Sequence, residues 1–135
     1  MKILAVVSSL FLLLVSAGAN AQEYPTKPIT LYVPFAPGGG SDIIARLVSQ
    51  KLAEALGQAV VVDNRPGANG NVAMAAVAAA EPDGYTLLFS SAAQIVFSPN
   101  TYQTMPANPI RDLKHITMVA EGDFIVLVNS EAGAK

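Results

Sequence analysis

An apolar segment, three consecutive glycines and an amphipathic helix follow one another without a break in the first half of this chain. Apolar residues alternate with Thr30 and Tyr32 over residues 29–33, which predicts a β-strand. Glycines occupy positions 38–40, and a helical pattern starts at Asp42. Glycine lets the backbone approach a ligand closely, and the first turn of a helix carries unpaired N–H groups at its positive dipole end. This order therefore predicts an α/β fold with a loop suited to an anion.

The first helix is predicted over residues 42–56. Gly57 stands where a glycine commonly ends a helix, and the apolar run 59–62 is typical of a strand buried on both faces of a parallel sheet. One apolar stripe of the helix is expected to face the core, formed by Ile43, Ile44, Leu47, Val48, Leu52, Ala55 and Leu56.

A second helix is predicted over residues 72–80, with Asn71 as its cap. Its alanine, valine and methionine side chains suit close packing against a sheet, and a third strand is expected over residues 86–89. Two βαβ units in series predict an open, mostly parallel α/β sheet.

The pattern weakens after Ser90. Residues 98–109 are expected to form a long loop with at most one helical turn, and two further strands are predicted over 116–119 and 124–128. Because the chain stops soon after the last of these, an apolar sheet edge would stay uncovered, and natural domains avoid such edges. We therefore expect a chain that has been cut short.

Residues 1–21 have the organisation of a secretory signal peptide. Lys2 supplies a positive charge, an apolar run follows, and Ala19-Asn20-Ala21 has the small-x-small form of a cleavage site. Cleavage after Ala21 would leave 22–135 as the mature chain, in the periplasm and without stable membrane insertion. The alternative is an uncleaved N-terminal anchor, although the apolar run is shorter than the roughly 20 residues that span a bilayer.

The composition excludes several classes of function. Without residues 1–21 the chain has seven Lys and Arg against ten Asp and Glu, and this acidic balance makes nucleic acid a poor partner. Cysteine is absent, which excludes disulfides, thiolate catalysis and thiolate metal sites. No cluster with metal-ligand spacing is evident, so we expect no metal and no cofactor.

Three segments are predicted to meet beyond the carboxyl ends of the strands, where open α/β sheets bind ligands. They span residues 35–41, 68–71 and 90–94, and they offer backbone N–H groups, small side chains or Ser, Asn and Gln donors, which suit a carboxylate. The candidate ligand-binding residues are Phe35, Ala36, Gly38, Gly39, Gly40 and Ser41 in the first segment, Asn69, Gly70 and Asn71 in the second, and Ser90, Ser91 and Ala92 in the third.

The glycine run also has a simpler interpretation, a tight turn without a ligand. It lacks the Lys-Ser/Thr of a phosphate-binding P-loop, and Ile43 stands where a dinucleotide fingerprint requires glycine or alanine. Ser41 or Asp42 is predicted to cap the helix, with Asp42 taken as the structural cap, and Asp42 can also lock the glycine loop for a ligand.

Catalysis is not expected. His115 is the only histidine, and no Gly-x-Ser-x-Gly nucleophile elbow is present, so an exported hydrolase is the least favoured alternative. Arg65 can pair with Asp63 or with a ligand, and the structural pairing is favoured.

Five short motifs occur in order and at close spacing. They start at Tyr24, Val33, Leu56, Asn64 and Pro82, and they read Tyr-Pro-x-Lys-Pro-Ile, Val-Pro-Phe-x-Pro-Gly-Gly, Leu-Gly-Gln, Asn-Arg-Pro-Gly-Ala and Pro-Asp-Gly-Tyr-Thr-Leu. Together they resemble the substrate-binding receptors of tripartite tricarboxylate transporters, the Bug family of periplasmic solute-binding proteins. The resemblance runs from Tyr24 to about Val128, although Ser98-Pro99 stands where the family usually has Asn-Pro.

The resemblance implies a two-lobed periplasmic-binding-protein fold of the type II-like, Venus flytrap kind, hinged around a small organic carboxylate. The chain would represent the first part of the N-terminal lobe, in residues 22–135, with the second lobe and the returning segment absent. Implied partners are the carboxylate ligand and the membrane transporter subunits. The alternative is an exported small α/β domain with a different interaction role.

Overall fold

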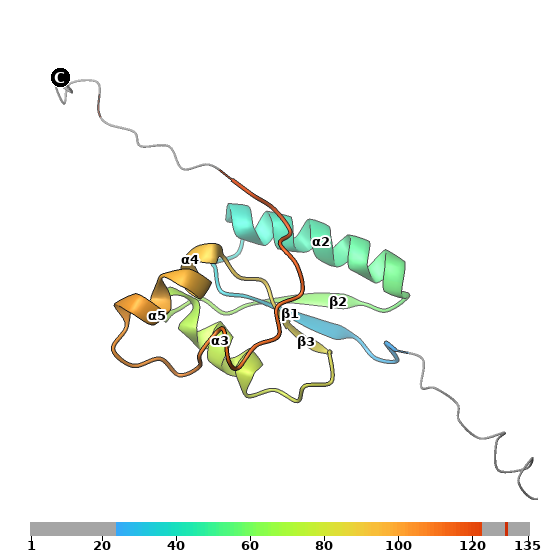
Figure 1. Cartoon of the computed structure of the whole chain (residues 1–135). Coiled ribbons are helices and arrows are strands. Elements are labelled where there is room, and N and C mark those ends of the chain that lie inside the picture. Colours follow the sequence, from blue (N-terminus) through green and yellow to red (C-terminus); the bar gives the residue numbers. More distant parts are fainter. Residues whose placement is uncertain (1–23, 123–128, 130–135) are drawn as a thin grey trace, which may run out of the picture.

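The described residues of the chain alternate between strands and helices. The structure, a computed structural model, describes residues 24–122 and Asn129. In this part α2 covers one face of a small sheet and α3 covers the other (Figure 1). The elements are β1 (Ile29–Val33), α2 (Gly40–Leu56), β2 (Val60–Asn64), the 3₁₀ turn η2 (Ala68–Gly70), α3 (Asn71–Ala78), β3 (Thr86–Leu88), α4 (Ala92–Val96) and α5 (Ser98–Thr101).

The sheet is parallel, as predicted. Within the described residues its strand order is β2-β1-β3, and Leu31 of β1 lies opposite Val62 on one side and Leu87 on the other. The chain thus passes from β1 to β2 on one side and then returns past β1 to β3. The carboxyl ends of the strands meet at one edge, and the direction of winding reverses between β1 and β3. This reversal is where open α/β sheets bind their ligands.

The core forms where small helical residues meet the central strand. Ala45 of α2 is fully buried and packs with Leu31 and Val33. On α3, Ala73 and Met74 are buried, and the helix contacts β3 and β1. Because small side chains allow a close approach, the Ala-rich sequence of α3 explains its packing on the sheet.

The predicted apolar stripe of α2 is wrong in part. Ile43 and Leu47 are 54% and 60% exposed, whereas the buried residues of the helix are Asp42, Ala45 and Ser49. The helix is rotated so that small and hydrogen-bonded side chains face the sheet, while the larger apolar side chains beside them stay uncovered within the described part. The predicted end of the helix is confirmed, since Gly57 has a left-handed φ of 67°.

The prediction that the second strand is buried on both faces is also wrong. In the described part of the chain β2 lies at the edge of the sheet, and Val61 is 52% exposed. A continuous apolar run shows that a segment is extended, but it does not reveal which neighbours cover it.

Of the predictions for the C-terminal part, the strand over residues 116–119 is wrong, whereas the helical turn within residues 98–109 is confirmed. Residues 116–119 form no strand, and Ile116 and Met118 are 79% and 76% exposed. A β-segment needs a partner strand, and none among the described residues pairs with this one. The predicted helical turn in 98–109 corresponds to α5, whereas α4 was not predicted because five residues are too few to show a helical period.

Two predicted segments lie outside the described residues: the signal peptide of residues 1–21 and the strand of residues 124–128. Among the helices that the structure describes, none combines the length and the apolar character needed to cross a membrane.

Candidate functional site

Gly70 marks the place where three segments converge at the carboxyl edge of the sheet. A Cβ atom built on Gly70 would lie 2.0 Å from Nε2 of Gln94 and 3.1 Å from Cβ of Pro34. Pro34 follows β1, Gly70 follows β2 and Gln94 follows β3. The structure therefore brings the segments that carry the predicted ligand residues to one edge of the sheet.

Asp42 holds the glycine loop, residues 35–41, in place through hydrogen bonds. Its side chain is almost fully buried, and Oδ2 accepts hydrogen bonds from the backbone N–H of Gly38 (2.9 Å) and from Nε of Arg46 (2.9 Å). Oδ1 accepts a bond from Nδ2 of Asn64 (2.8 Å), which also donates to the carbonyl oxygen of Phe35 (3.0 Å). The loop is thus held at both of its ends by one carboxylate and one amide.

The same contacts determine the ionisation of this carboxyl group. The hydrogen bond from Arg46 contributes most, followed by those from the Gly38 N–H and Asn64, and together they hold the pKa of Asp42 well below its ordinary value. Burial acts in the opposite direction but is outweighed. Asp42 is therefore an anion throughout the neutral range, and the guanidinium of Arg46 balances its charge.

The prediction of Asp42 as a helix cap is corrected by this geometry. The cap position of α2 is Gly39, which makes no side-chain capping bond, and Asp42 is the third residue of the helix. Its carboxylate reaches back to the N–H of Gly38, ahead of the helix. Locking of the loop, the other role considered from the sequence, is the role that these contacts describe.

The glycine loop leaves backbone donors available. In the described part of the chain no protein acceptor is assigned to the N–H groups of residues 39–42, as is usual at a helix start. Gly38, Gly39 and Gly40 are exposed, as is Ala36, and Ser41 is half-buried. Phe35 is partly buried against the core cluster. The loop therefore presents an exposed group of N–H donors at the positive end of a helix of 17 residues.

The second segment has an unusual backbone. Residues 67–70 all have positive φ, and two of them, Ala68 (46°) and Asn69 (52°), are not glycine. Such conformations are uncommon for residues with a Cβ atom and tend to gather at functional sites. Nδ2 of Asn69 donates to Oγ of Ser98 (3.3 Å), which connects this segment to α5.

Asn71 does not cap α3 as predicted. It is the first residue of the helix, Gly70 occupies the cap position, and no side-chain capping bond is made. Asn71 is buried, and its Oδ1 has no hydrogen-bond partner among the described residues. The correction follows from the left-handed φ of Gly70 (89°), which places the helix start one residue earlier than the pattern suggests.

The third segment is organised by Gln94. Oε1 of Gln94 accepts hydrogen bonds from the hydroxyl of Ser90 (2.6 Å) and from the backbone N–H of Ser91 (3.2 Å). Both serines are half-buried, whereas Ala92, at the start of α4, is exposed. The predicted residues of this segment thus depend on a side chain that was not among the predicted site residues.

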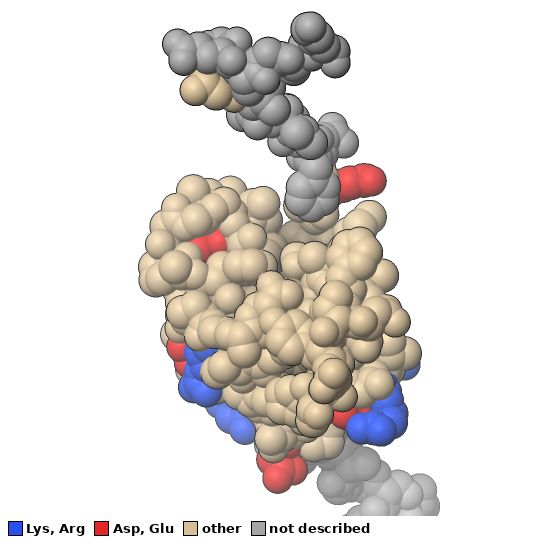
Figure 2. Space-filling view, turned by 90° about the vertical axis from the view of Figure 1, so that its left-hand side faces the viewer, with Lys and Arg blue, Asp and Glu red and all other residues tan. Residues whose placement is uncertain are grey.

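The face at the carboxyl edge is largely uncharged. Figure 2 views the molecule from this side and shows a broad surface of neutral residues, with most Lys and Arg side chains toward the lower border. Two arginines come close to this edge, but both are engaged. Arg46 binds Asp42 and Asn64, and Arg65 binds Asp63 (3.0 Å) and lies 4.0 Å from the ring centre of Tyr32. The favoured structural pairing of Arg65 is confirmed.

Metal and histidine chemistry find no support within the part of the chain that is described. No cluster of three or more His, Cys, Asp or Glu side chains could hold a metal ion there. Nε2 of His115 lies 3.0 Å from the carbonyl oxygen of Pro109, a local loop contact.

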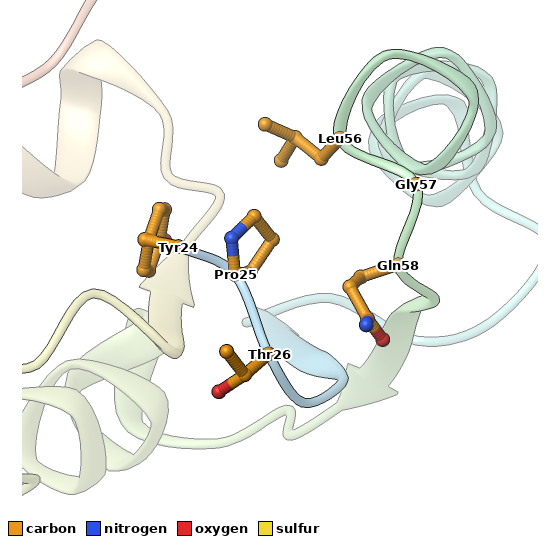
Figure 3. Close-up of a pocket in the computed structure, with 6 residues that line it drawn as sticks. All are labelled: Tyr24, Pro25, Thr26, Leu56, Gly57 and Gln58. Atoms are coloured by element: carbon orange, nitrogen blue, oxygen red, sulfur yellow. The ribbon is translucent and has the colours of Figure 1, made fainter. Parts of the chain in front are cut away.

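A cavity of about 500 Å³ lies at the opposite edge of the sheet. Figure 3 shows residues that precede β1 on one side of it and the end of α2 on the other. It presents no charged side chain, and none of the predicted ligand residues line it. The residues that line it are Tyr24, Pro25, Thr26, Leu56, Gly57 and Gln58.

Sequence reasoning missed two side chains that shape the carboxyl edge, Asn64 and Ser98, and it placed Gln94 in the third predicted segment without naming it among the contact residues. Asn64 is the last residue of β2, two positions after the apolar run 59–62, so its place at the end of a strand was the available signal. Gln94 stands three residues after Ser91, the spacing of a capping box. Ser98 carried no signal, since its contact with Asn69 joins residues far apart in the chain.

Comparison with protein families identifies a family of receptors. The model described as "Tripartite tricarboxylate transporter family receptor" matches residues 44–135. A UPF0065 protein of Bordetella bronchiseptica is 42% identical over 114 residues, covering 84% of this chain and 34% of that protein. The protein BugT of Bordetella pertussis is 38% identical over 116 residues, covering 85% of this chain and 36% of that protein. The chain thus spans about a third of the length of the curated relatives it matches.

Solved structures show the same likeness. A periplasmic transporter structure aligns with a TM-score of 0.63 at 46% identity, covering 65% of this chain and 30% of that one. Rpa4515 of R. palustris, solved with adipate, aligns with a TM-score of 0.58 at 42% identity, covering 64% of this chain and 29% of that one. MatC from Rhodopseudomonas palustris, with bound malate, aligns with a TM-score of 0.53 at 37% identity, covering 66% of this chain and 30% of that one.

These findings confirm the predicted fold class, a partial lobe of a periplasmic-binding-protein fold with a parallel sheet. They also agree with the prediction of a binding protein, because the matching family is one of receptors and not of enzymes.

Proposed function

Because this chain belongs to the receptor family of tripartite tricarboxylate transporters, whose receptors are periplasmic, we propose that it is part of an extracytoplasmic solute receptor. Its ligand is a small organic carboxylate, which the whole receptor delivers to the membrane subunits of a transporter of this kind. The observation that carries the proposal is the glycine loop at the carboxyl edge, with exposed N–H donors and a fixed shape.

The chemistry of this edge favours a carboxylate over other anions. A carboxylate is recognised by a few directed N–H and O–H donors, which the glycine loop and the serines after β3 provide. Among the described residues, the two arginines close to this edge are already paired, Arg46 with Asp42 and Arg65 with Asp63, which disfavours a more highly charged phosphate group. The adipate and malate of Rpa4515 and MatC, both dicarboxylates, support the same ligand class.

The proposed contacts come from three segments. Residues 39–41 hold one carboxylate group through backbone N–H groups, whereas the N–H of Gly38 is bonded to Asp42, so that Gly38, Phe35 and Ala36 border the ligand. Asn69, Gly70 and Asn71 form a second wall, and Ser90, Ser91 and Ala92 form the third. Asp42 stays beneath the loop and preserves its shape. No bond is made or broken, and no cofactor or metal takes part.

We further propose that residues 1–21 are a signal peptide and that residues 22–135 are the first part of the N-terminal ligand-binding lobe. Once cleaved, this segment would have no stable insertion in the membrane. Sequencing the N-terminus of the exported protein tests the cleavage site, with Gln22 expected as the first residue; an N-terminus at Met1 would contradict it. Reading the coding DNA beyond Lys135 tests the assignment to a larger receptor, with a second α/β lobe expected.

A titration followed by NMR tests the binding site. Malate and adipate are added to the ¹⁵N-labelled chain, and the diamide of malate serves as the uncharged control. We expect both acids, and not the diamide, to shift the amide signals of Gly39, Gly40 and Ser41, while those of Gln58 and Gly84 at the opposite edge stay unchanged. Shifts confined to the cavity beside Gln58 would contradict the proposed site.

The chain alone is expected to bind weakly. A hinged receptor surrounds its ligand with two lobes, so a single lobe supplies only part of the contacts. We expect no carboxylate affinity tighter than about millimolar, roughly −4 kcal/mol. Micromolar binding to the isolated chain, measured by calorimetry, would contradict this expectation.

A further inference from the structure

Gln94 is a buried polar side chain at the centre of the carboxyl edge. It is 2% exposed, although glutamine is usually found at the surface. We infer that Gln94 is a positioning residue, which sets the loop after β3 against the segment around Gly70. The inference rests on the proposed function, since it assigns the two loops to one carboxylate site.

One end of the Gln94 amide organises the serine loop. Oε1 accepts the hydroxyl of Ser90 at 2.6 Å and the backbone N–H of Ser91 at 3.2 Å. The N–H of Ser91 fixes the orientation of the amide, because only an oxygen can accept it. Two predicted ligand residues are therefore oriented by one acceptor atom.

The other end of the amide faces the second segment. Nε2 lies so close to Gly70 that a Cβ atom there would be 2.0 Å away. Gly70 has a φ of 89° and immediately precedes the buried Asn71. Only a residue without a side chain allows this contact, so the length and orientation of Gln94 determine how closely the two loops approach.

Two buried atoms at this contact have no partner in the described part of the chain. They are Nε2 of Gln94, a donor close to Gly70, and Oδ1 of Asn71, an acceptor on the residue that follows Gly70. Buried polar atoms are nearly always hydrogen-bonded, and exceptions gather where a structure serves a purpose other than stability. Because Gln94 is almost fully buried, we expect it to act through Ser90, Ser91 and Gly70 rather than on the ligand itself.

Hydrogen exchange tests the positioning role without any ligand. In Gln94→Met, a side chain of similar length lacks the acceptor, and we expect exchange of the Ser91 amide to accelerate on the order of tenfold or more. The amide of Arg65, bonded to the carbonyl oxygen of Val33, should be unchanged. Gln94→Glu keeps an acceptor and should retain most of the protection of Ser91. Unchanged exchange at Ser91 in Gln94→Met would overturn the inference.

Where Gln94→Met fails to fold, Ser90→Ala provides the second route. This change removes one bond to Oε1 at a half-buried position, and it should accelerate exchange at Ser91 while leaving Arg65 protected. Acceleration of both amides to the same extent would indicate general destabilisation and would overturn the positioning role.

A malate titration connects the inference to the proposed site. We expect Gln94→Met to weaken the malate-dependent shift of Ser91 by about tenfold, whereas Gln58→Met, at the opposite edge, should match the wild-type chain. Equal titrations of Gln94→Met and the wild type would overturn the inference. If malate causes no shift in the wild-type chain, the proposed function is contradicted instead. The hydrogen exchange of the Ser91 amide then tests the positioning role of Gln94 independently of any ligand.

Discussion

The amino edge of the sheet, where the strands begin, and the carboxyl edge, where they end, both carry polar groups. Within the described residues, these groups pair with one another at the amino edge and are partly unpaired at the carboxyl edge. At the amino edge, polar groups satisfy one another: the hydroxyl of Tyr24 donates to the carbonyl oxygen of Gly84 (2.7 Å), and the N–H of Thr26 donates to the hydroxyl of Tyr85 (2.8 Å). Lys27 pairs with Asp83 at 3.0 Å and lies over the ring of Tyr85. These contacts close the edge by joining the start of β1 to the start of β3.

At the carboxyl edge, polar groups are left available. Gly39 and Gly40 are exposed and their N–H groups have no acceptor among the described residues. Residues 67–70 have positive φ, and two buried amide atoms also lack partners in this part of the chain. Asp42 is the exception, because both oxygens of its carboxylate accept hydrogen bonds. Its bonds hold the glycine loop in place and do not join the loops of this edge to one another as the bonds of the amino edge do. The difference supports the proposal that the carboxyl edge binds the ligand while the amino edge stabilises the fold, although a cavity of about 500 Å³ lies at the amino edge.

The largest expected effect contrasts one glycine from each edge. Gly70→Ala places a Cβ atom against Gln94 and Pro34 at a φ of 89°, and we expect it to lower the free energy of unfolding by roughly 3 kcal/mol. Gly57→Ala, at a φ of 67° with nothing within 4 Å, carries only the backbone cost of about 1 kcal/mol. Urea unfolding of both variants measures the difference. Equal losses would show that backbone conformation alone matters and that the close contact with Gln94 does not.

A smaller effect is expected on the stability of the fold at low pH, where the contributions of Asp42 and Asp83 can be compared. The pKa of Asp42 is lowered by Arg46, Gly38 and Asn64, and the pKa of Asp83 is lowered by the N–H of Tyr85 and by Lys27. A carboxyl group with a lowered pKa in the folded state stabilises the fold above its ordinary pKa and loses this contribution as the pH falls below it. Both Asp42→Asn and Asp83→Asn should therefore reduce stability at neutral pH and flatten its decline below about pH 4.

Asp42→Asn should show the larger of these changes. Asp42 is 3% exposed and receives three hydrogen bonds, whereas the side chains of Lys27 and Asp83 are 59% and 40% exposed, and water screens such pairs. Thermal unfolding between pH 2 and pH 7 compares the variants with the wild type. A larger change for Asp83→Asn would reverse the proposed importance of the glycine-loop lock.

The sequence predicted the fold more successfully than the details of the site. The alternation of β1, the small side chains of α3 and the position of Gly57 are local signals, and each led to the observed element. Burial of β2 and of Ile43 depends on neighbours that the local pattern does not contain. The three segments of the candidate site could be predicted because parallel strands end at one edge. The role of Asn64 could not, since it arises from contacts with Phe35 and Asp42, which are distant in the chain. The capping-box spacing of Gln94 likewise did not reveal its contact with Gly70.

The smallest expected effect belongs to Tyr24 at the amino edge. Tyr24→Phe removes a single hydrogen bond, to the carbonyl oxygen of Gly84, from a side chain that is 52% exposed. Water replaces the lost partner at such a position, so we expect the free energy of unfolding to fall by only about 0.5 kcal/mol. The malate-dependent shifts of Gly39 and Gly40 should be identical to those of the wild type, since the sheet separates the two edges. A weaker malate titration in Tyr24→Phe would mean that the amino edge takes part in binding, and the division between a stabilising and a binding edge would then be wrong.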